Sequence, residues 1–294
     1  MMMYRIQPNC AMMAAELEGT LAQNHFVECG SSQEKTAGWI EPRGEKHGPL
    51  LELVGGQMIL KLMTEVKTVP SSVIHRKATE RASQIEASAG RKPGKKELKE
   101  IKDEIRLSLL PMAFTKQAAL WVWIDPDARL LVIDTSSQSR ADEVITLLVK
   151  CIEGFAVTPI NTALTPAVAM ADWLMTQEPP PGFSIDRECE LKAQDDSKAV
   201  VRYARHALDT DEVRQHIEGG KAPTRVALTW DSRLSFLLTD AMQVKKLTFL
   251  DVVFENSLTN KSDGFDADLA IMTSELKQLI PDLILALGGE LSLA

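Results

Sequence analysis

Two consecutive segments, residues 72–89 and 97–110, carry apolar residues at steps of three and four. These residues are Ile74, Ala78, Ala82, Ile85, Ala89, Leu98, Ile101, Ile105 and Leu109. The spacing predicts two amphipathic helices, and the intervening GRKPGKK predicts a break because it contains two glycines and a proline. We therefore predict a protruding helical hairpin at about 71–110, with Ser71 as the N-cap of its first helix.

Strand patterns flank this hairpin on both sides. The segment LLELVGGQMILKLM (50–63) predicts two apolar strands joined by a turn at Gly55 and Gly56. Residues 118–136 alternate as a second strand pair around an Asp-Pro-Asp turn, with Trp121 and Trp123 on one face. An amphipathic helix is predicted at 139–154, with Val144, Leu147, Leu148 and Cys151 facing inward.

Three consecutive prolines in TQEPPPGF (176–183) indicate a linker, because such a run fits neither a helix interior nor a central strand. We therefore predict an N-terminal domain at 1–175 and a C-terminal domain at 184–294. In the second domain the pattern predicts four strands, a short helix at 209–220 and a final helix from Asp266 to Gly288, kinked at Pro281. The predicted fold class is α+β, with mixed or antiparallel sheets and packed helices.

Composition narrows the class of protein further. With 45% hydrophobic and 25% charged residues the chain is typical of soluble globular proteins, and no apolar run reaches the roughly 18 residues of a membrane span. The start, MMMYRIQPNC, lacks the pattern of a signal peptide. The four cysteines are too far apart for a zinc site or a disulfide framework, so we expect free thiols and a cytoplasmic location.

Charge is unevenly distributed along the chain. The formal net charge is −8, yet residues 61–116 hold 13 Lys and Arg against 7 Asp and Glu, while residues 251–294 hold 2 against 8. Because charges are screened beyond about 8–10 Å, a local basic patch matters more to a polyanion than the total does. The pattern is compatible with a phosphate-binding surface on an otherwise acidic protein.

Signatures of catalysis are sparse. No GxSxG or protease motif occurs, and the five histidines show no metal-ligand spacing, so we expect no enzyme, no metal and no cofactor. One alternative stays open, because Glu65 and Lys67 form the E-x-K half of a metal-dependent nuclease site. Such a site also needs an upstream carboxylate, and only glutamates such as Glu52 precede it.

Ten stretches together resemble the recombination-associated RdgC family of bacteria over nearly the whole chain. In order they are GWIEP, VPSSVI, DEIRLSLLPMAF, RADEVITLL, ADW, VVRYARHALDTDEV, HIEGGKAPTRVALTW, KKLTF, FDADLAIMTSEL and LILALGGE. The LLP-x-AF and FDAD…LGGE motifs are specific only in combination. This chain has Met112 where the family commonly has arginine, and it has Ala204, Arg205 and His206 where the family carries basic and amide residues.

The resemblance implies a ring-shaped homodimer that binds double-stranded DNA without sequence preference and restrains the RecA recombinase, in the cytoplasm at the nucleoid. Phe114 would then fill a pocket on the partner subunit; burial in the core of its own subunit is the alternative. A third possibility is a module that acts directly on the recombinase through the basic hairpin. The candidates for phosphate contact are Lys67, Arg76, Lys77, Lys116, Arg140, Arg202, Arg205, Lys221 and Arg225.

Overall fold

The computed structural model describes residues 1–8, 10, 14–254 and 264–291. The chain forms two compact units. The first unit comprises Met1–Ala14, Leu51–Ile59 and Val122–Ala294, and the second comprises Ala15–Leu50 and Leu60–Trp121. The segment 177–182 connects helix α5 (Pro166–Thr176) to strand β8 (Phe183–Ala193) without regular structure, and both of its flanks belong to the first unit. The predicted boundary between two domains at the prolines stays a prediction.

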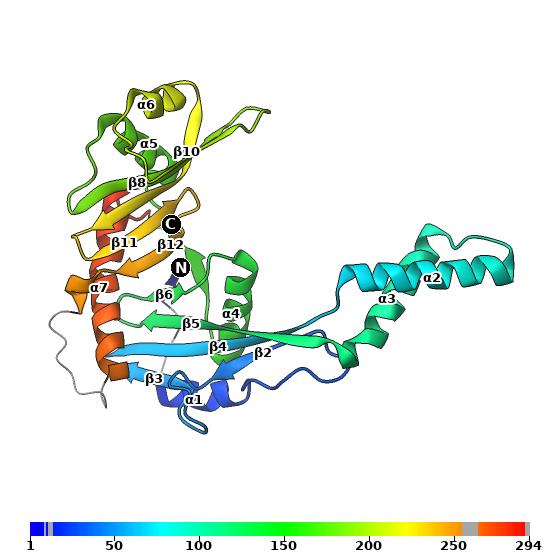
Figure 1. Ribbon diagram of the computed structural model, residues 1–294. Coiled ribbons are helices and arrows are strands. Elements are labelled where there is room, and N and C mark those ends of the chain that lie inside the picture. The colour runs from blue at the N-terminus through cyan, green and yellow to red at the C-terminus, as the bar shows by residue number, and fades with distance from the viewer. Residues whose placement is uncertain (9, 11–13, 255–263, 292–294) are drawn as a thin grey trace. The chain divides into compact units, whose positions relative to one another are not determined.

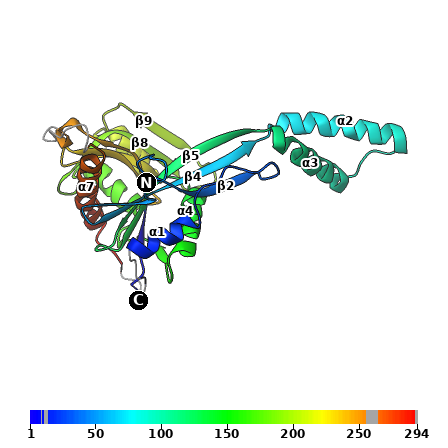
Figure 2. The same ribbon diagram turned by 90° about the horizontal axis from the view of Figure 1, so that it is seen from below.

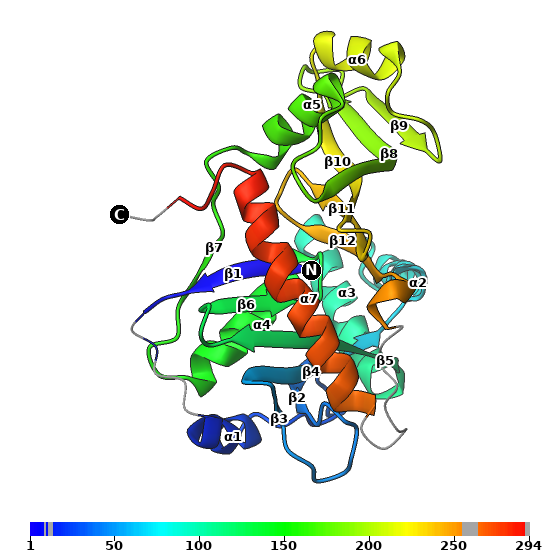
Figure 3. The same ribbon diagram turned by 90° about the vertical axis from the view of Figure 1, so that its left-hand side faces the viewer.

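One sheet of the first unit is built around β1 (Met2–Ile6). This strand pairs antiparallel with β6 (Leu130–Ile133) and with β7 (Val157–Pro159), and β6 pairs with the end of β5 (Phe114–Asp125). Helix α7 (Gly264–Ala286) runs across these strands in Figure 3. It buries Leu276, Leu279, Ile280 and Leu283, whose spacing of three and four residues places them on one face of the helix.

A second sheet of the first unit has five strands in the order β12-β11-β10-β8-β9, with every neighbouring pair antiparallel. Its strands are β8 (Phe183–Ala193), β9 (Val200–Ala204), β10 (Lys221–Trp230), β11 (Leu234–Thr239) and β12 (Val244–Phe249). Helices α5 and α6 (Asp211–Glu218) pack on β10. Alternation puts Cys189, Leu191, Val226 and Leu228 in the core, so charged residues between them face away from it.

In the second unit, β2 (Lys35–Ile40) pairs antiparallel with β4 (Gln57–Thr68), and α1 spans Ala14–Ala22. Helices α2 (Ser71–Ala89) and α3 (Lys95–Leu109) contact each other and lie beyond the ends of β4 and β5 (Figures 1 and 2). Burial within this helix pair is sparse, being limited to Ile74 and Ala78 of α2 and Ile101 of α3. Most of the helix pair is therefore surface.

The main sequence predictions hold. The protein is a mixed α+β protein with antiparallel sheets, and the described residues contain seven α-helices. Gly55 and Gly56, at φ +57° and +79°, form the turn between β3 (Leu51–Val54) and β4. Gly288, at φ +83°, ends α7, and the next amide donates to the Ile284 carbonyl, as in a Schellman motif. The four cysteines are free thiols.

Three details differ from the predictions. Helix α2 begins at Ser71 itself, with Pro70 at the N-cap position, where its carbonyl accepts from the amides of Val73 and Ile74. Leu147 is only half-buried, and Ala141 takes its place on the inner face of α4 (Gln138–Cys151). Helix α7 begins at Gly264, so Asp266 lies in its first turn. Asp263, just before it, lies outside the described residues.

Strand β5 also starts earlier than predicted, at Phe114, and β8 was not predicted at all. Both segments contain three consecutive polar residues, at 115–117 and 186–188, which weakens an apolar strand signal. The α-helices of the described residues include none that is long and apolar enough to span a membrane.

Candidate nucleic-acid interface

Phe114 opens strand β5 directly after a 3₁₀ turn, Leu110–Met112, that contains Pro111. Leu110 anchors this turn in the core with 1% of its surface exposed, whereas Phe114 is 88% exposed. Met112 and Leu107 nearby in the chain are also exposed, at 75% and 58%. Phe114 is therefore not part of the core of its own chain, and the second unit carries three exposed apolar side chains at this junction.

Three candidate phosphate-binding cations of the second unit, Arg76, Lys77 and Lys116, are exposed. Arg76 and Lys77 follow each other on α2, and Lys116 lies two residues after Phe114 on β5. Lys77 also lines a shallow groove of about 340 Å³ between α2 and α3, together with Glu80, Arg81 and Glu104. Within the described residues none of these three cations forms an ion pair, so their charge is available to a ligand.

The tip of the helix pair is partly neutralised. Arg91 pairs with Glu97 at 2.7 Å, and Lys92 lies 3.7 Å from Glu86. The Glu97 contact raises the pKa of Arg91, and the Arg91 hydrogen bond lowers the pKa of Glu97. These charges are compensated within the turn, so the tip contributes less to an anion site than its composition suggests.

Glu65 and Lys67, the possible half of a nuclease site, are both engaged inside the second unit. The Glu65 side chain is buried, its Oε1 accepts from the Cys29 amide at 2.8 Å and its Oε2 accepts from Gln117 Nε2 at 2.7 Å. The backbone hydrogen bond from Cys29 first, and the Gln117 bond second, lower the pKa of Glu65. The Lys67 ammonium donates to the Gly30 and Ser31 carbonyls at 2.7 and 3.1 Å. Both side chains thus hold the loop around residues 29–31.

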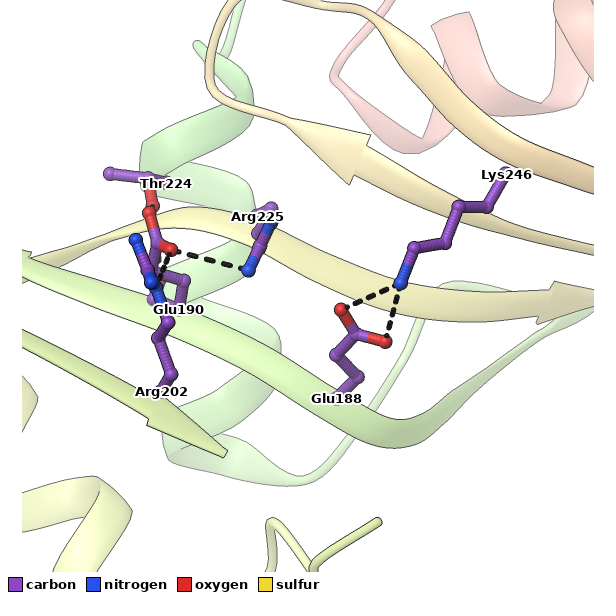
Figure 4. A network of polar contacts seen from close by, with 6 residues as sticks. All are labelled: Glu188, Glu190, Arg202, Thr224, Arg225 and Lys246. Atoms are coloured by element: carbon purple, nitrogen blue, oxygen red, sulfur yellow. Dashed lines mark hydrogen bonds and ion pairs between the residues drawn. The ribbon is translucent and has the colours of Figure 1, made fainter. Parts of the chain in front are cut away.

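Arg202 and Arg225 are brought together by the five-stranded sheet, as Figure 4 shows. Both lie opposite Glu190 of β8, Arg202 on β9 and Arg225 on β10. Arg202 Nε lies 2.5 Å and Arg225 Nη2 3.3 Å from the same oxygen, Glu190 Oε2, while Thr224 donates to Oε1 at 2.7 Å. Burial acts to raise the pKa of Glu190, but the Thr224 and Arg202 hydrogen bonds and the Arg225 charge outweigh it, so the pKa is lowered.

The other candidates of the first unit differ in exposure. Arg205 is exposed in the turn after β9, where its backbone takes a left-handed φ of +55°. Lys221 points its ammonium at His216 Nδ1, 3.1 Å away, and Arg140 is half-buried at the start of α4. Tyr203 lies near His216, and burial first and the Glu212 carboxylate second raise the pKa of Tyr203 to about 12.

Sequence reasoning missed the acidic partners in this sheet, namely Glu190 and also Glu188, whose carboxylate receives Lys246 Nζ at 3.1 Å. The signal was present in DRECELKA (186–193), where charged residues alternate with Cys189 and Leu191. A period of two predicts a strand with one charged face. Among the described residues, no three His, Cys, Asp or Glu side chains gather in a way that could hold a metal ion.

These features define an α+β protein with exposed cations and an exposed aromatic in one unit and a charged sheet face in the other. The family model described as "Putative exonuclease, RdgC" matches residues 1–290. A "Recombination-associated protein RdgC" of Janthinobacterium sp. (strain Marseille) is 42% identical over 290 residues, covering 98% of this chain and 96% of the relative. Its counterpart in Dechloromonas aromatica (strain RCB) is 41% identical over 294 residues, with the same coverage of both chains. The chain therefore belongs to the RdgC family, which confirms the resemblance seen in its sequence.

Proposed function

We propose that this protein binds double-stranded DNA without sequence preference, as a ring-shaped homodimer without catalytic activity, and thereby limits the access of the RecA recombinase to DNA. The observation that carries the proposal is the excess of Lys and Arg in residues 61–116, where Arg76, Lys77 and Lys116 are exposed. Contacts between such cations and phosphates need no base readout and gain free energy mainly by releasing counterions.

Phe114 supports the dimer. An aromatic side chain that is 88% exposed leaves most of its apolar surface in water, and side chains of this type commonly anchor protein interfaces. Met112 and Leu107 would extend the contact around it. In a two-fold dimer each basic surface occurs twice, so a duplex would meet two copies of every cation. The α2–α3 pair would then act as a protruding arm of each subunit.

The test is the dependence of duplex affinity on salt. We expect log K to fall linearly with log salt, with a slope of about −0.9 for each phosphate neutralised, and to be equal for unrelated sequences. Closed circular duplex should retain the protein longer than linear duplex of the same length, because a ring slides off free ends. A duplex affinity that does not change with salt concentration, or that is high for one DNA sequence only, would overturn the proposal.

The effect on the recombinase needs a separate experiment. RecA filament assembly is followed on duplex-containing DNA with wild-type protein and with a variant that no longer binds DNA. If the variant that no longer binds DNA still inhibits RecA, the protein acts on the recombinase itself, which is the third possibility given above. If this variant no longer inhibits RecA filament assembly, the result would support the proposal that the protein limits the access of RecA to DNA.

The second candidate is a metal-dependent nuclease, which the word "exonuclease" in the family description favours. Its carboxylate would be Glu65 and its cation Lys67, but both Glu65 oxygens and the Lys67 ammonium already make hydrogen bonds within the fold. A metal ion would have to displace the Cys29 and Gln117 donors. Cleavage of linear duplex with Mg²⁺ that disappears in Lys67→Ala would establish this function; the same trace activity in both proteins would reject it.

A further inference from the structure

Glu190, Arg202 and Arg225 form a row across three adjacent strands of the five-stranded sheet (Figure 4). We infer that Glu190 is a positioning residue for DNA binding: it holds the two arginines in the orientation that receives a backbone phosphate, and its negative charge limits how tightly they bind it. The inference rests on the proposed function, because it assigns Arg202 and Arg225 to the phosphate-binding surface.

The geometry fixes the carboxylate from both sides. Thr224 Oγ donates to Oε1 at 2.7 Å, so this bond restrains rotation of the carboxylate. Oε2 then receives Arg202 Nε at 2.5 Å and lies 3.3 Å from Arg225 Nη2. Charge-assisted contacts of this kind are directional and hold planar guanidinium groups in one orientation. Two long, flexible side chains on separate strands are thereby oriented before any ligand arrives, which lowers the entropy lost on binding.

Exposure is graded across the row. The Glu190 side chain is 15% exposed, that of Arg225 34% and that of Arg202 67%. The carboxylate therefore lies beneath the cations, and a phosphate approaching from solvent meets the guanidinium groups first. Arg202 donates to Glu190 through Nε alone. The two Nη groups of Arg202 are therefore not used by this contact. Those groups provide four N–H donors in the planar arrangement that suits phosphate oxygens.

Charge in the row is unequal. Two arginines face one carboxylate, which leaves one positive charge in excess, whereas Lys246 and Glu188 on the same sheet neutralise each other. A phosphate on Arg202 would lie close to Glu190 Oε2, and like charges at this range repel. The same carboxylate thus improves the orientation of the arginines and also opposes the negatively charged ligand.

Two substitutions separate these effects. In Glu190→Gln the amide oxygen can replace Oε2 and the NH₂ group can donate to Thr224 Oγ, so orientation is kept while the charge is lost. We expect duplex affinity to rise about three- to tenfold, the range expected for removing one partly screened repulsion at a surface, with a steeper salt slope. In Glu190→Ala both charge and orientation are lost, so affinity should be lower than in Glu190→Gln.

Glu188→Gln is the matched control, because it removes one carboxylate from the same strand two residues away. If duplex affinity rises equally in Glu188→Gln and Glu190→Gln, the change in net charge alone explains the effect, and the inference is overturned. Unchanged affinity in Glu190→Gln, or an affinity of Glu190→Ala that equals or exceeds that of Glu190→Gln, would also overturn it. Thermal unfolding midpoints of all variants show whether the fold is kept.

Arg202→Ala distinguishes failure of the inference from failure of the proposed function. If wild-type protein binds duplex with a salt-dependent slope but Arg202→Ala and Arg225→Ala bind equally well, the row lies outside the interface and only the inference fails. If wild-type protein does not bind duplex at all, the proposed function fails, and the inference fails with it.

Discussion

The α2–α3 pair of the second unit and the five-stranded sheet of the first unit differ in the pairing of their cations and in the burial of their apolar side chains. In the sheet, Arg202, Arg225 and Lys246 all contact carboxylates, and β10 and β11 bury most of their apolar side chains in a core. In the helix pair, three residues are buried, and Arg76 and Lys77 have no ion pair within the described residues. Phe114, which follows α3, is exposed.

The difference shows that the region that stabilises the fold is not the region whose cations are unpaired. Stability of a domain comes mainly from buried apolar area, which the sheet has and the helix pair largely lacks. Cations that are not compensated internally, by contrast, can release counterions when a polyanion binds. Basic residues therefore have carboxylate partners within the chain in the sheet, whereas Arg76 and Lys77 of the helix pair have none among the described residues, and this difference leads to four predictions.

The largest expected effect is on the core of the sheet. Leu228 of β10 is fully buried opposite Ile185 and Phe236, so Leu228→Ala should lower the free energy of unfolding by about 3 kcal/mol. Urea denaturation followed by tryptophan fluorescence measures it. Leu285→Ala, which truncates a 73% exposed leucine of α7, is the control and should change stability by less than about 0.5 kcal/mol. If both variants lose a similar free energy of unfolding, burial at these positions does not determine their contribution to stability.

Phe114→Ala should leave the fold intact but weaken the proposed homodimer. Truncating an aromatic anchor commonly costs more than about 2 kcal/mol of binding free energy, or roughly thirtyfold in the dimer dissociation constant. Sedimentation equilibrium measures this constant. Val168→Ala, at a 57% exposed position on α5, is the matched control and should leave it unchanged. A monomer that unfolds at lower urea in Phe114→Ala would count against an interface role.

A smaller effect distinguishes uncompensated from compensated cations. Arg76→Ala with Lys77→Ala should reduce the magnitude of the salt slope of duplex binding by up to about 1.8, since each phosphate contact contributes about 0.9. Arg91→Ala with Lys92→Ala removes the same charge at the tip, where both side chains face carboxylates. The second pair should change the slope less. If it changes the slope more, the tip of the helix pair is the DNA contact.

The smallest effect concerns pH and Glu65. Its pKa is lowered in the folded protein, mainly by the Cys29 amide and then by Gln117. A lowered folded-state pKa adds stability that is fully present above the unfolded value of about 4.3 and is lost as pH falls through the folded value. The thermal midpoint should therefore fall less steeply below about pH 4.3 in Glu65→Gln than in wild-type. Glu80→Gln, an exposed control on α2, should follow the wild-type curve.

Much of the fold could be predicted because its elements carry a strong period. The apolar steps of α2 and α3 and the glycine turn before β4 all marked their elements correctly. Strand β8 was missed because only Cys189 and Leu191 interrupt its charged positions, and its apolar signal is therefore weak. Ser71 was predicted as a cap from residue type alone, whereas the Pro70 carbonyl already accepts the first helical amides.

The candidate site was less predictable because partners are distant in the chain. Sequence shows that Lys67 is a cation but not that it donates to carbonyls 36 and 37 residues away. It shows Arg202 and Arg225, yet the carboxylate that joins them lies on a third strand. The exposure of Phe114 was equally open, since an aromatic between a helix and a strand suits a core as well as a surface.

Strands β4 and β5 each begin in one unit and end in the other. No single cut of the gene therefore yields either unit as an intact fragment, and cleavage within 177–182 would split the first unit internally. An internal deletion of residues 69–113, with β4 joined to β5 by a short turn, is the dissection that respects this connectivity. It would produce a shortened protein without the helix pair, in which the sheets can be studied alone.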